Sequence, residues 1–223
     1  MFEVLFENDD LLVIDKATNV SVLADRGGEA CLWDHLKDTY QTPLLVHRLD
    51  KGTSGVMAVA LNLSTQSALT RAFMERRVIK LYLARIVGNL DLTGTGTIDL
   101  PLRRGRKSRF RVAGQRDAIV RSGDTWTLPE ANQGHASLTR CRRVHAAEDN
   151  CVILKPLTGR THQLRVHLSW IGHPIVGDSL YGKPTSPEQV ADRLMLHAHK
   201  LTLPKFGTFC APVAAGFEIY RSV

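Results

Sequence analysis

The sequence lacks the features of a membrane-spanning, exported or disulfide-stabilised protein. The purely apolar run from Val56 to Leu61 is far too short to cross a bilayer. The N-terminus is acidic, whereas a signal peptide starts with basic residues. The chain has only four cysteines, widely separated and without a CxxC pair or zinc-ribbon spacing, so we expect reduced and mostly buried thiols. These absences favour a cytoplasmic protein.

Low-complexity tracts and internal repeats are also absent. With 223 residues, of which 43% are hydrophobic types, the chain is long enough for one well-filled core, or for two small lobes that share a cleft. We interpret residues 1–223 as one domain of catalytic size. Several short strand patterns with few helices between them predict an α+β fold built on a mixed or antiparallel sheet.

Local patterns predict the elements of this fold. Strands are expected at residues 4–6, 11–14, 44–46, 56–61, 81–87, 136–144 and 151–154. Helices are expected over residues 30–38, after Ser64 as N-cap, and from residues 158–161 to Gly172, which ends the helix. Residues 88–135 are expected to form loops and short hairpins, and the part from Ser122 to His135 is a candidate for disorder in the free protein.

Positive charge is concentrated outside the N-terminal part of the chain. Residues 1–40 contain nine acidic and three basic side chains, a net −6, while the remaining residues carry +13 and the whole chain +7. The densest block, residues 103–111, has six cations, an embedded Phe110 and no acid. Because Lys and Arg attract phosphates and an aromatic ring can stack on a base, we place a candidate polyanion-contacting insertion at about residues 103–135. For a charge run alone, a solvated basic loop is the simpler interpretation.

A second signal comes from the stretch LLVHRLDKGTSGV at residues 44–56. Asp50 stands between a predicted strand and a glycine turn, where a carboxylate can be held rigidly as a nucleophile or general base. The simpler alternative is an Asx-type turn, in which the carboxylate accepts hydrogen bonds from the residues that follow. The letters DKGT also resemble the aspartyl-phosphate motif of phosphotransferring hydrolases, but the order differs and no downstream acidic pair for a metal is found.

Five sequence blocks resemble the RluA-type family of RNA pseudouridine synthases. HRLDKGTSG (residues 47–55) is similar to the family signature His-Arg-Leu-Asp, two variable residues, then Thr-Ser-Gly. KLYLA (80–84) resembles its Lys-x-Tyr element, and LTGRTHQLRVH (157–167) resembles its Gly-Arg-[Ser/Thr]-His-Gln-[Leu/Ile]-Arg-x-His helix. GHPIVGD (172–178) and LHA (196–198) also fit family patterns. The blocks follow the family order, and the resemblance extends from Leu11 to Pro212, which is nearly all of the chain.

The resemblance implies an isomerase that converts uridine to pseudouridine in tRNA or rRNA, with a central catalytic cleft, flanking helices and no cofactor. Uracil would leave ribose through N1, turn within the site and rejoin through C5. Asp50 would be the catalytic aspartate, acting on ribose C1′, on base C6 or by promoting loss of a ribose proton. Tyr82 would stack on the extruded base and Arg165 would pair with Asp50. Arg48 would enter the RNA stack in place of the flipped uridine.

The cations and histidines near these motifs are candidate RNA contacts. They are His47, Arg48, Arg103, Arg104, Arg106, Lys107, Arg109, Arg160 and His162. We exclude a metal site, because His162 and His167 are five residues apart on a predicted helix and face different directions. The resemblance to the family implies an RNA stem-loop as the partner.

The sequence departs from its relatives at two places. The loop DKATNV at residues 15–20 replaces the Lys-Pro-x-Gly of many family members, and no S4-type RNA-binding domain precedes the first predicted strand. RNA affinity would then come from the cleft and the basic segment, and we expect a monomer because no coiled-coil heptad is present. The rival from another class is a non-catalytic RNA-binding module, which would be expected to have lost the aspartate or the tyrosine; both are present.

Overall fold

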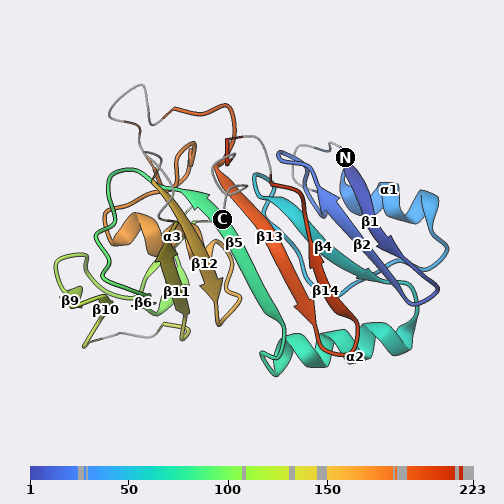
Figure 1. Cartoon of the computed structure of the whole chain (residues 1–223), viewed down its shortest axis with the longest axis horizontal. Helices are drawn as coiled ribbons and strands as arrows, with labels where there is room; N and C mark the ends of the chain where they lie inside the picture. Colours follow the sequence, from blue (N-terminus) through green and yellow to red (C-terminus); the bar gives the residue numbers. More distant parts are fainter. Residues whose placement is uncertain are drawn as a thin grey trace. The chain divides into compact units, whose positions relative to one another are not determined.

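The computed structural model describes residues 1–24, 28, 30–106, 109–130, 134–144, 150–182, 184, 190–213 and 216–217 (Figure 1). The chain divides into two compact units, residues 1–81 with 197–214 and residues 82–196 with 215–223. Within the described ranges, no helix is long and apolar enough to cross a membrane.

A mixed sheet forms the body of the first unit. Its strands are β1 (Phe2–Glu7), β2 (Leu11–Lys16), β3 (Leu44–Leu45), β4 (Ser54–Ala60), β13 (Leu196–Leu203) and β14 (Gly207–Cys210). β2 pairs antiparallel with β1 and β4, and β4 pairs in parallel with β13. β3 and β14 add antiparallel partners to β4 and β13. Every residue of β4 is buried, which accounts for its nearly continuous apolar sequence.

The first unit also contains two helices, α1 (Leu32–Thr39) and α2 (Leu63–Met74). α1 buries Leu32 and Leu36, four residues apart on one face. The prediction of Ser64 as the N-cap of α2 is wrong. The cap is Asn62, whose side-chain oxygen accepts the amide hydrogen of Thr65 at 2.9 Å, so the helix begins two residues earlier than predicted.

The second unit is built on a strand series with mostly antiparallel pairing. Its strands are β5 (Ile79–Arg85, in this unit from Tyr82), β6 (Gly96–Asp99), β7 (Leu102–Arg104), β8 (Phe110–Val112), β9 (Val120–Ser122), β10 (Thr125–Thr127), β11 (Leu138–Arg143) and β12 (Cys151–Pro156). The pairing order runs β5, β12, β11, β6, β10, β9, with only β6 and β10 parallel, and β7 and β8 form a separate hairpin. The predicted α+β class with a mixed sheet is confirmed.

Helix α3 (Gln163–Trp170) begins later than predicted. His162 at its N-cap is in the left-handed region, with φ 56°, which breaks the helical path between the motif residues 158–161 and Gln163. Its predicted end is confirmed, because Gly172 has φ 95° and donates its amide hydrogen to the carbonyl of Ser169.

The segment from Ser122 to His135 contains β10, so the expectation of disorder is wrong for its described part; residues 131–133 lie outside it. Trp126 of β10 is only 5% exposed, and the Arg121 guanidinium lies 4.8 Å from the centre of its ring. Burial of a large aromatic side chain under a cation explains the order of this polar segment.

Cys31, Cys141 and Cys151 are buried and Cys210 is exposed, all as free thiols. The expectation of mostly buried cysteines is therefore confirmed. Burial raises the pKa of the Cys141 thiol to about 12, which keeps it protonated.

Candidate functional site

Asp50 lies in a turn of the first unit, and a main-chain hydrogen bond closes this turn. The amide of Thr53 donates to the carbonyl oxygen of Asp50 at 3.0 Å. Leu49 is buried, while Arg48 is exposed and Asp50 is half-buried. The buried leucine anchors the chain on the core side and leaves its two polar neighbours at the surface.

The residues that follow the turn are held against β13. Ser54 Oγ lies 2.9 Å from His197 Nδ1, and the parallel register pairs Ser54 with His197 and Gly55 with Ala198. Gly55 has φ 112°, and a Cβ there would lie 2.2 Å from the carbonyl oxygen of Ala198. Only glycine fits this approach. The Thr-Ser-Gly and Leu-His-Ala blocks, far apart in sequence, therefore form one contact.

The buried Lys16 side chain stabilises the Asp50 turn through hydrogen bonds to main-chain carbonyls. Its side chain is fully buried, and Nζ donates to the carbonyl oxygens of Ala17, Val20 and Lys51 at 2.8, 2.9 and 3.3 Å. Thr18 Oγ1 adds a hydrogen bond of 2.8 Å to the carbonyl of Gly52. The loop that departs from the family pattern is thus fastened to the residues directly after Asp50. Sequence reasoning noted the departure but did not identify this contact.

His47 is half-buried, and its ring is held by contacts with the protein. Its Nε2 accepts the amide hydrogen of Ala58 at 3.0 Å, and its ring stacks on Phe73 with centres 4.7 Å apart. Burial, and next the charge of Lys80, lower the pKa of His47 to about 3, so the ring is neutral. This geometry favours a structural role for His47, which holds the loop that contains Arg48, rather than a charged contact with phosphate.

The second unit carries Tyr82 and Arg165. Tyr82 lies on β5 opposite Leu154 of β12 and is half-buried. Arg165 on α3 is 7% exposed and donates through Nε and one Nη to the two carboxylate oxygens of Asp178, at 2.8 and 2.7 Å. Asp50 belongs to the first unit, so its predicted pairing with Arg165 stays a prediction.

Asp178, the partner of Arg165, was given no role by the sequence alone. Besides the Arg165 pair, its Oδ1 accepts the amide hydrogens of Leu180 and Tyr181 at 2.9 and 3.0 Å. A bidentate pair of this kind fixes both the position and the plane of a guanidinium. The sequence signal was present in the block GHPIVGD, whose last residue is this aspartate.

The start of α3 is held by Gln163. Its amide group donates to the carbonyl of Leu138 and to Thr139 Oγ1, at 3.1 and 3.0 Å. Its Oε1 accepts from Thr158 Oγ1 at 2.7 Å and from the amide of Arg160 at 3.1 Å. The glutamine thereby connects the motif before the helix to β11 and orients α3.

The histidines of this motif make protein contacts. His167 is fully buried, with Nδ1 3.0 Å from Thr139 Oγ1 and Nε2 2.9 Å from the carbonyl of Leu100. Burial lowers its pKa to about 4. His162 Nδ1 lies 2.8 Å from Tyr181 Oη. Among the described residues, no group of three or more His, Cys, Asp and Glu side chains is arranged to hold a metal ion.

The predicted RNA-contacting cations are mostly at the surface. Arg104, Arg106 and Arg109 on the β7–β8 hairpin are exposed, as is Arg160, whereas Arg103 is half-buried. Lys107 lies outside the described residues. Three exposed guanidinium groups on one short hairpin, together with the half-buried Arg103, form a site of positive potential suited to a polyanion.

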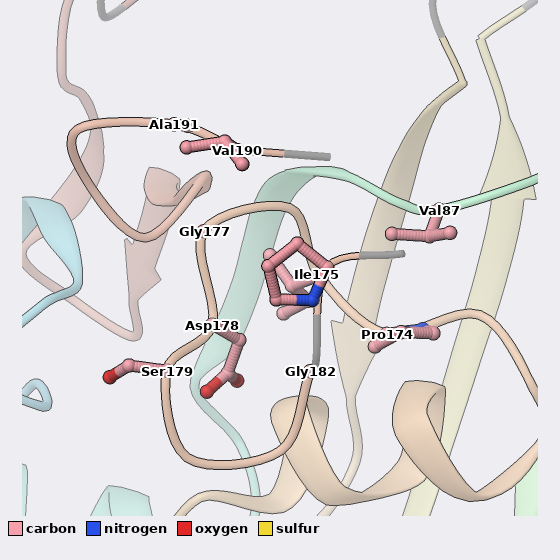
Figure 2. Close-up of a pocket in the computed structure, with 10 residues that line it drawn as sticks. Val87, Pro174, Ile175, Gly177, Asp178, Ser179, Gly182, Val190 and Ala191 are labelled. Atoms are coloured by element: carbon pink, nitrogen blue, oxygen red, sulfur yellow. The ribbon is translucent and has the colours of Figure 1, made fainter. Parts of the chain in front are cut away.

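A pocket of about 200 Å³ lies in the second unit (Figure 2). It is lined by Val87, Pro174, Ile175, Gly177, Asp178, Ser179, Gly182, Pro184, Val190 and Ala191. Apart from Asp178, whose carboxylate holds Arg165, these residues offer apolar groups and small polar ones. The pocket therefore does not supply groups for proton transfer, and we do not assign it to the catalytic residues.

Comparison with known proteins identifies relatives over most of the chain. A family model described as RNA pseudouridylate synthase matches residues 10–170. The dual-specificity RNA pseudouridine synthase RluA of Escherichia coli K12 is 35% identical over 218 residues, which is 94% of this chain and 92% of that protein. The protein of the same name from Yersinia pestis is 35% identical over 211 residues, covering 92% and 94% of the two chains.

Solved structures give the same result. The human RNA pseudouridylate synthase domain containing 1 protein has a TM-score of 0.76 and 31% identity, over 96% of this chain and 84% of that one. Human RNA pseudouridylate synthase domain containing 4 has a TM-score of 0.77 at 23% identity, over 96% and 90% of the two chains, and so supports the fold alone.

Proposed function

Because the chain belongs to the RluA-type family of RNA pseudouridine synthases, and is therefore an isomerase, we propose that Asp50, Tyr82 and Arg165 carry its reaction. The N1–C1′ bond of a uridine breaks, a C5–C1′ bond forms, the C5 hydrogen is lost and N1 gains a proton. Atoms and electrons balance without a cofactor. Asp50 interacts with the reacting nucleotide, Tyr82 stacks on the extruded base, and Arg165 stabilises the Asp50 carboxylate.

The rigid turn around Asp50 is the observation that supports this assignment. Lys16 and Thr18 hold the carbonyls of Lys51 and Gly52, and Gly55 lies directly against the backbone of β13. A carboxylate placed on such a preorganised turn loses little orientational freedom when it engages a substrate. On the second unit, Asp178 gives Arg165 a similarly fixed geometry.

The RNA substrate is proposed to be a stem-loop of tRNA, rRNA or both. The curated relatives are named dual-specificity RNA pseudouridine synthases. The exposed Arg104, Arg106 and Arg109 supply charge for backbone phosphates, and the exposed Arg48 is suited to fill the space of the flipped uridine. We further propose that residues 1–223 act as one catalytic domain, as a monomer and in the cytoplasm.

The test is tritium release from tRNA and rRNA labelled at uridine C5, with EDTA present. The intact protein is compared with Asp50→Asn, which keeps the size of the side chain and removes its charge. We expect release that survives EDTA and falls by at least about 10³-fold in the variant, a loss typical of a residue that makes or breaks a bond. Equal release by both proteins would overturn the role of Asp50.

A control variant keeps the assay interpretable. Asp38→Asn removes an exposed carboxylate in α1 and should leave release unchanged. RNA binding without release from either labelled RNA would instead favour a binding module over the proposed reaction.

A further inference from the structure

The hydroxyl group of Tyr181 joins the basic hairpin to the start of α3. The amide of Phe110, the first residue of β8, donates to Tyr181 Oη at 2.9 Å, and His162 Nδ1 lies 2.8 Å from the same oxygen. An amide N–H can only donate, so the Tyr181 hydroxyl oxygen accepts the hydrogen bond from Phe110. The ring of Phe110 also meets that of His162 edge-on, with centres 5.9 Å apart.

The rest of Tyr181 contacts Arg165 and the residues that hold it. The guanidinium carbon of Arg165 lies 5.2 Å from the centre of the Tyr181 ring. The Tyr181 amide donates to Asp178 Oδ1 at 3.0 Å, and its carbonyl accepts from Ser169 Oγ at 2.7 Å. A cation over an aromatic face is an attractive contact that depends on the position of the ring. Displacement of Tyr181 therefore changes both sides of the Arg165–Asp178 pair.

Strand β8 and the segment that follows it contact the C-terminal end of α3. Arg116 and Arg111 place their guanidinium groups 5.4 and 5.9 Å from the ring centre of Trp170, the last residue of the helix. Arg116 also donates to the carbonyl of Ser169 at 3.1 Å. A cation at a helix C-terminus is stabilised by the helix dipole. Residues 110–116 thus contact α3 from its N-cap to its last turn, and Arg165 lies between these two contacts.

We propose that Tyr181 is a positioning residue that couples RNA contact at the β7–β8 hairpin to the placement of Arg165. This inference rests on the proposed function, in which the exposed hairpin arginines bind phosphate and Arg165 acts at the reacting uridine. Phosphate bound to the hairpin arginines fixes the position of the Phe110 amide, which hydrogen-bonds the Tyr181 hydroxyl. The Tyr181 ring then keeps the Arg165 guanidinium in the position that the reaction requires. The binding energy of RNA remote from the uridine is thereby used in the chemical step.

Tyr181→Phe tests the coupling, because it removes the hydroxyl and keeps the ring over Arg165. At saturating RNA we expect kcat for tritium release to fall about 3- to 10-fold, the value of one hydrogen bond, with KM changed less than about 2-fold. Tyr40→Phe is the matched control, since it removes a hydroxyl bonded to Glu7 in the first unit and should change neither constant. A change in KM alone, or no change, would overturn the proposal.

A double-mutant cycle separates coupling from a purely structural role. The second partner is a hairpin variant, Arg104→Gln, Arg106→Gln and Arg109→Gln together, which weakens phosphate contact. If Tyr181 transmits that contact, Tyr181→Phe should change kcat less than about 2-fold in the hairpin variant. A structural defect would lower kcat by the same factor in both backgrounds, and that additive result would contradict the coupling.

The Nε–H resonance of Arg165, observed by NMR as RNA is added, provides a test without turnover. We expect the resonance to shift in the intact protein and to shift less in Tyr181→Phe. Equal shifts would overturn the coupling. Failure of the intact protein to release tritium would overturn the proposed function instead, and the NMR comparison would still decide the coupling.

Discussion

At the scale of single residues, Lys16 shows how a buried side chain organises the turn that contains Asp50. A charged ammonium group is costly to bury unless hydrogen bonds replace its water. Here three carbonyl oxygens accept from Nζ, and one of them belongs to Lys51, next to Asp50. Thr18 adds a hydrogen bond from the same loop to the carbonyl of Gly52, so two hydrogen bonds join this loop to the Asp50 turn. The loop without the family's proline and glycine is thus held by side-chain hydrogen bonds.

The Thr18 contact gives a prediction for this chain. Thr18→Val removes the hydroxyl that donates to Gly52 while keeping the shape of the side chain. We expect the free energy of unfolding to fall by about 1 kcal/mol and kcat to fall several-fold, because the turn after Asp50 loses one restraint. Urea titration and tritium release measure the two effects.

The matched control is Thr39→Val in α1. The Thr39 hydroxyl also donates to a main-chain carbonyl, that of His35 at 2.9 Å, but this bond lies outside the Asp50 turn. Its loss should lower stability by a similar amount and leave kcat unchanged. If both variants retain full kcat, Thr18 has no part in positioning Asp50.

At the scale of elements, the contact between β4 and β13 explains the Thr-Ser-Gly motif. β4 follows the Asp50 turn directly, so any shift of its first residues against β13 moves Asp50. The register brings Ser54 to His197 and Gly55 to Ala198, residues 143 positions apart in each case. Close backbone approach at Gly55 makes this register depend on the absence of a side chain.

Gly55→Ala should therefore be strongly destabilising. The new Cβ would lie 2.2 Å from the carbonyl oxygen of Ala198 at a φ of 112°, so β4 and β13 would have to move apart. We expect a loss of about 3 kcal/mol or more in the free energy of unfolding, since left-handed strain and steric overlap act together. Chemical denaturation measures it.

Gly123→Ala separates the two causes. Gly123 also has a positive φ, 56°, but a Cβ there would meet no atom within 4 Å. This control should lose only about 1 kcal/mol, the cost of the left-handed conformation. Equal losses in the two variants would show that crowding against Ala198 does not matter.

At the scale of the whole molecule, stability should depend on buried neutral histidines. Burial lowers the pKa of His167 to about 4, against 6.5 for an ordinary histidine, and lowers that of His47 in the same direction. Below pH 6.5 the unfolded chain binds protons that the folded chain excludes. The folded state should therefore lose about 1.4 kcal/mol per pH unit for His167 as pH falls from 6.5 towards 4, and nothing from this source above pH 6.5.

Urea titrations between pH 5 and pH 8 test this dependence. His167→Gln should be less stable at pH 8, because it loses the buried bonds to Thr139 and Leu100, but its stability should fall less steeply with acid. His35→Gln, at an exposed histidine of α1, should keep the slope of the intact protein. An unchanged slope in His167→Gln would show that this ring titrates normally in the fold.

The amino-acid sequence by itself determined the class of fold, seven of the fourteen strands that the structure describes, the helix positions to within a few residues, and the motif that contains Asp50. These features depend on local patterns: apolar runs, turn residues and short motifs that remain adjacent whatever the chain does elsewhere. The sequence patterns gave wrong predictions at the start of α3 and in the segment that contains β10. His162 adopts a left-handed conformation that delays α3, and Trp126 is buried enough to order a polar segment.

The tertiary structure alone decided which side chains meet. Arg165 with Asp178, Lys16 with the carbonyl of Lys51, and Tyr181 with the Phe110 amide are separated by 13, 35 and 71 residues. A hydrogen bond requires two atoms within about 3 Å at a suitable angle, and strand register and helix rotation set that geometry. Periodicity shows which face of an element is buried, but not which distant partner lies against it. For that reason the sequence could name Asp50 and Arg165, while the residues that hold them in place emerged only from the fold.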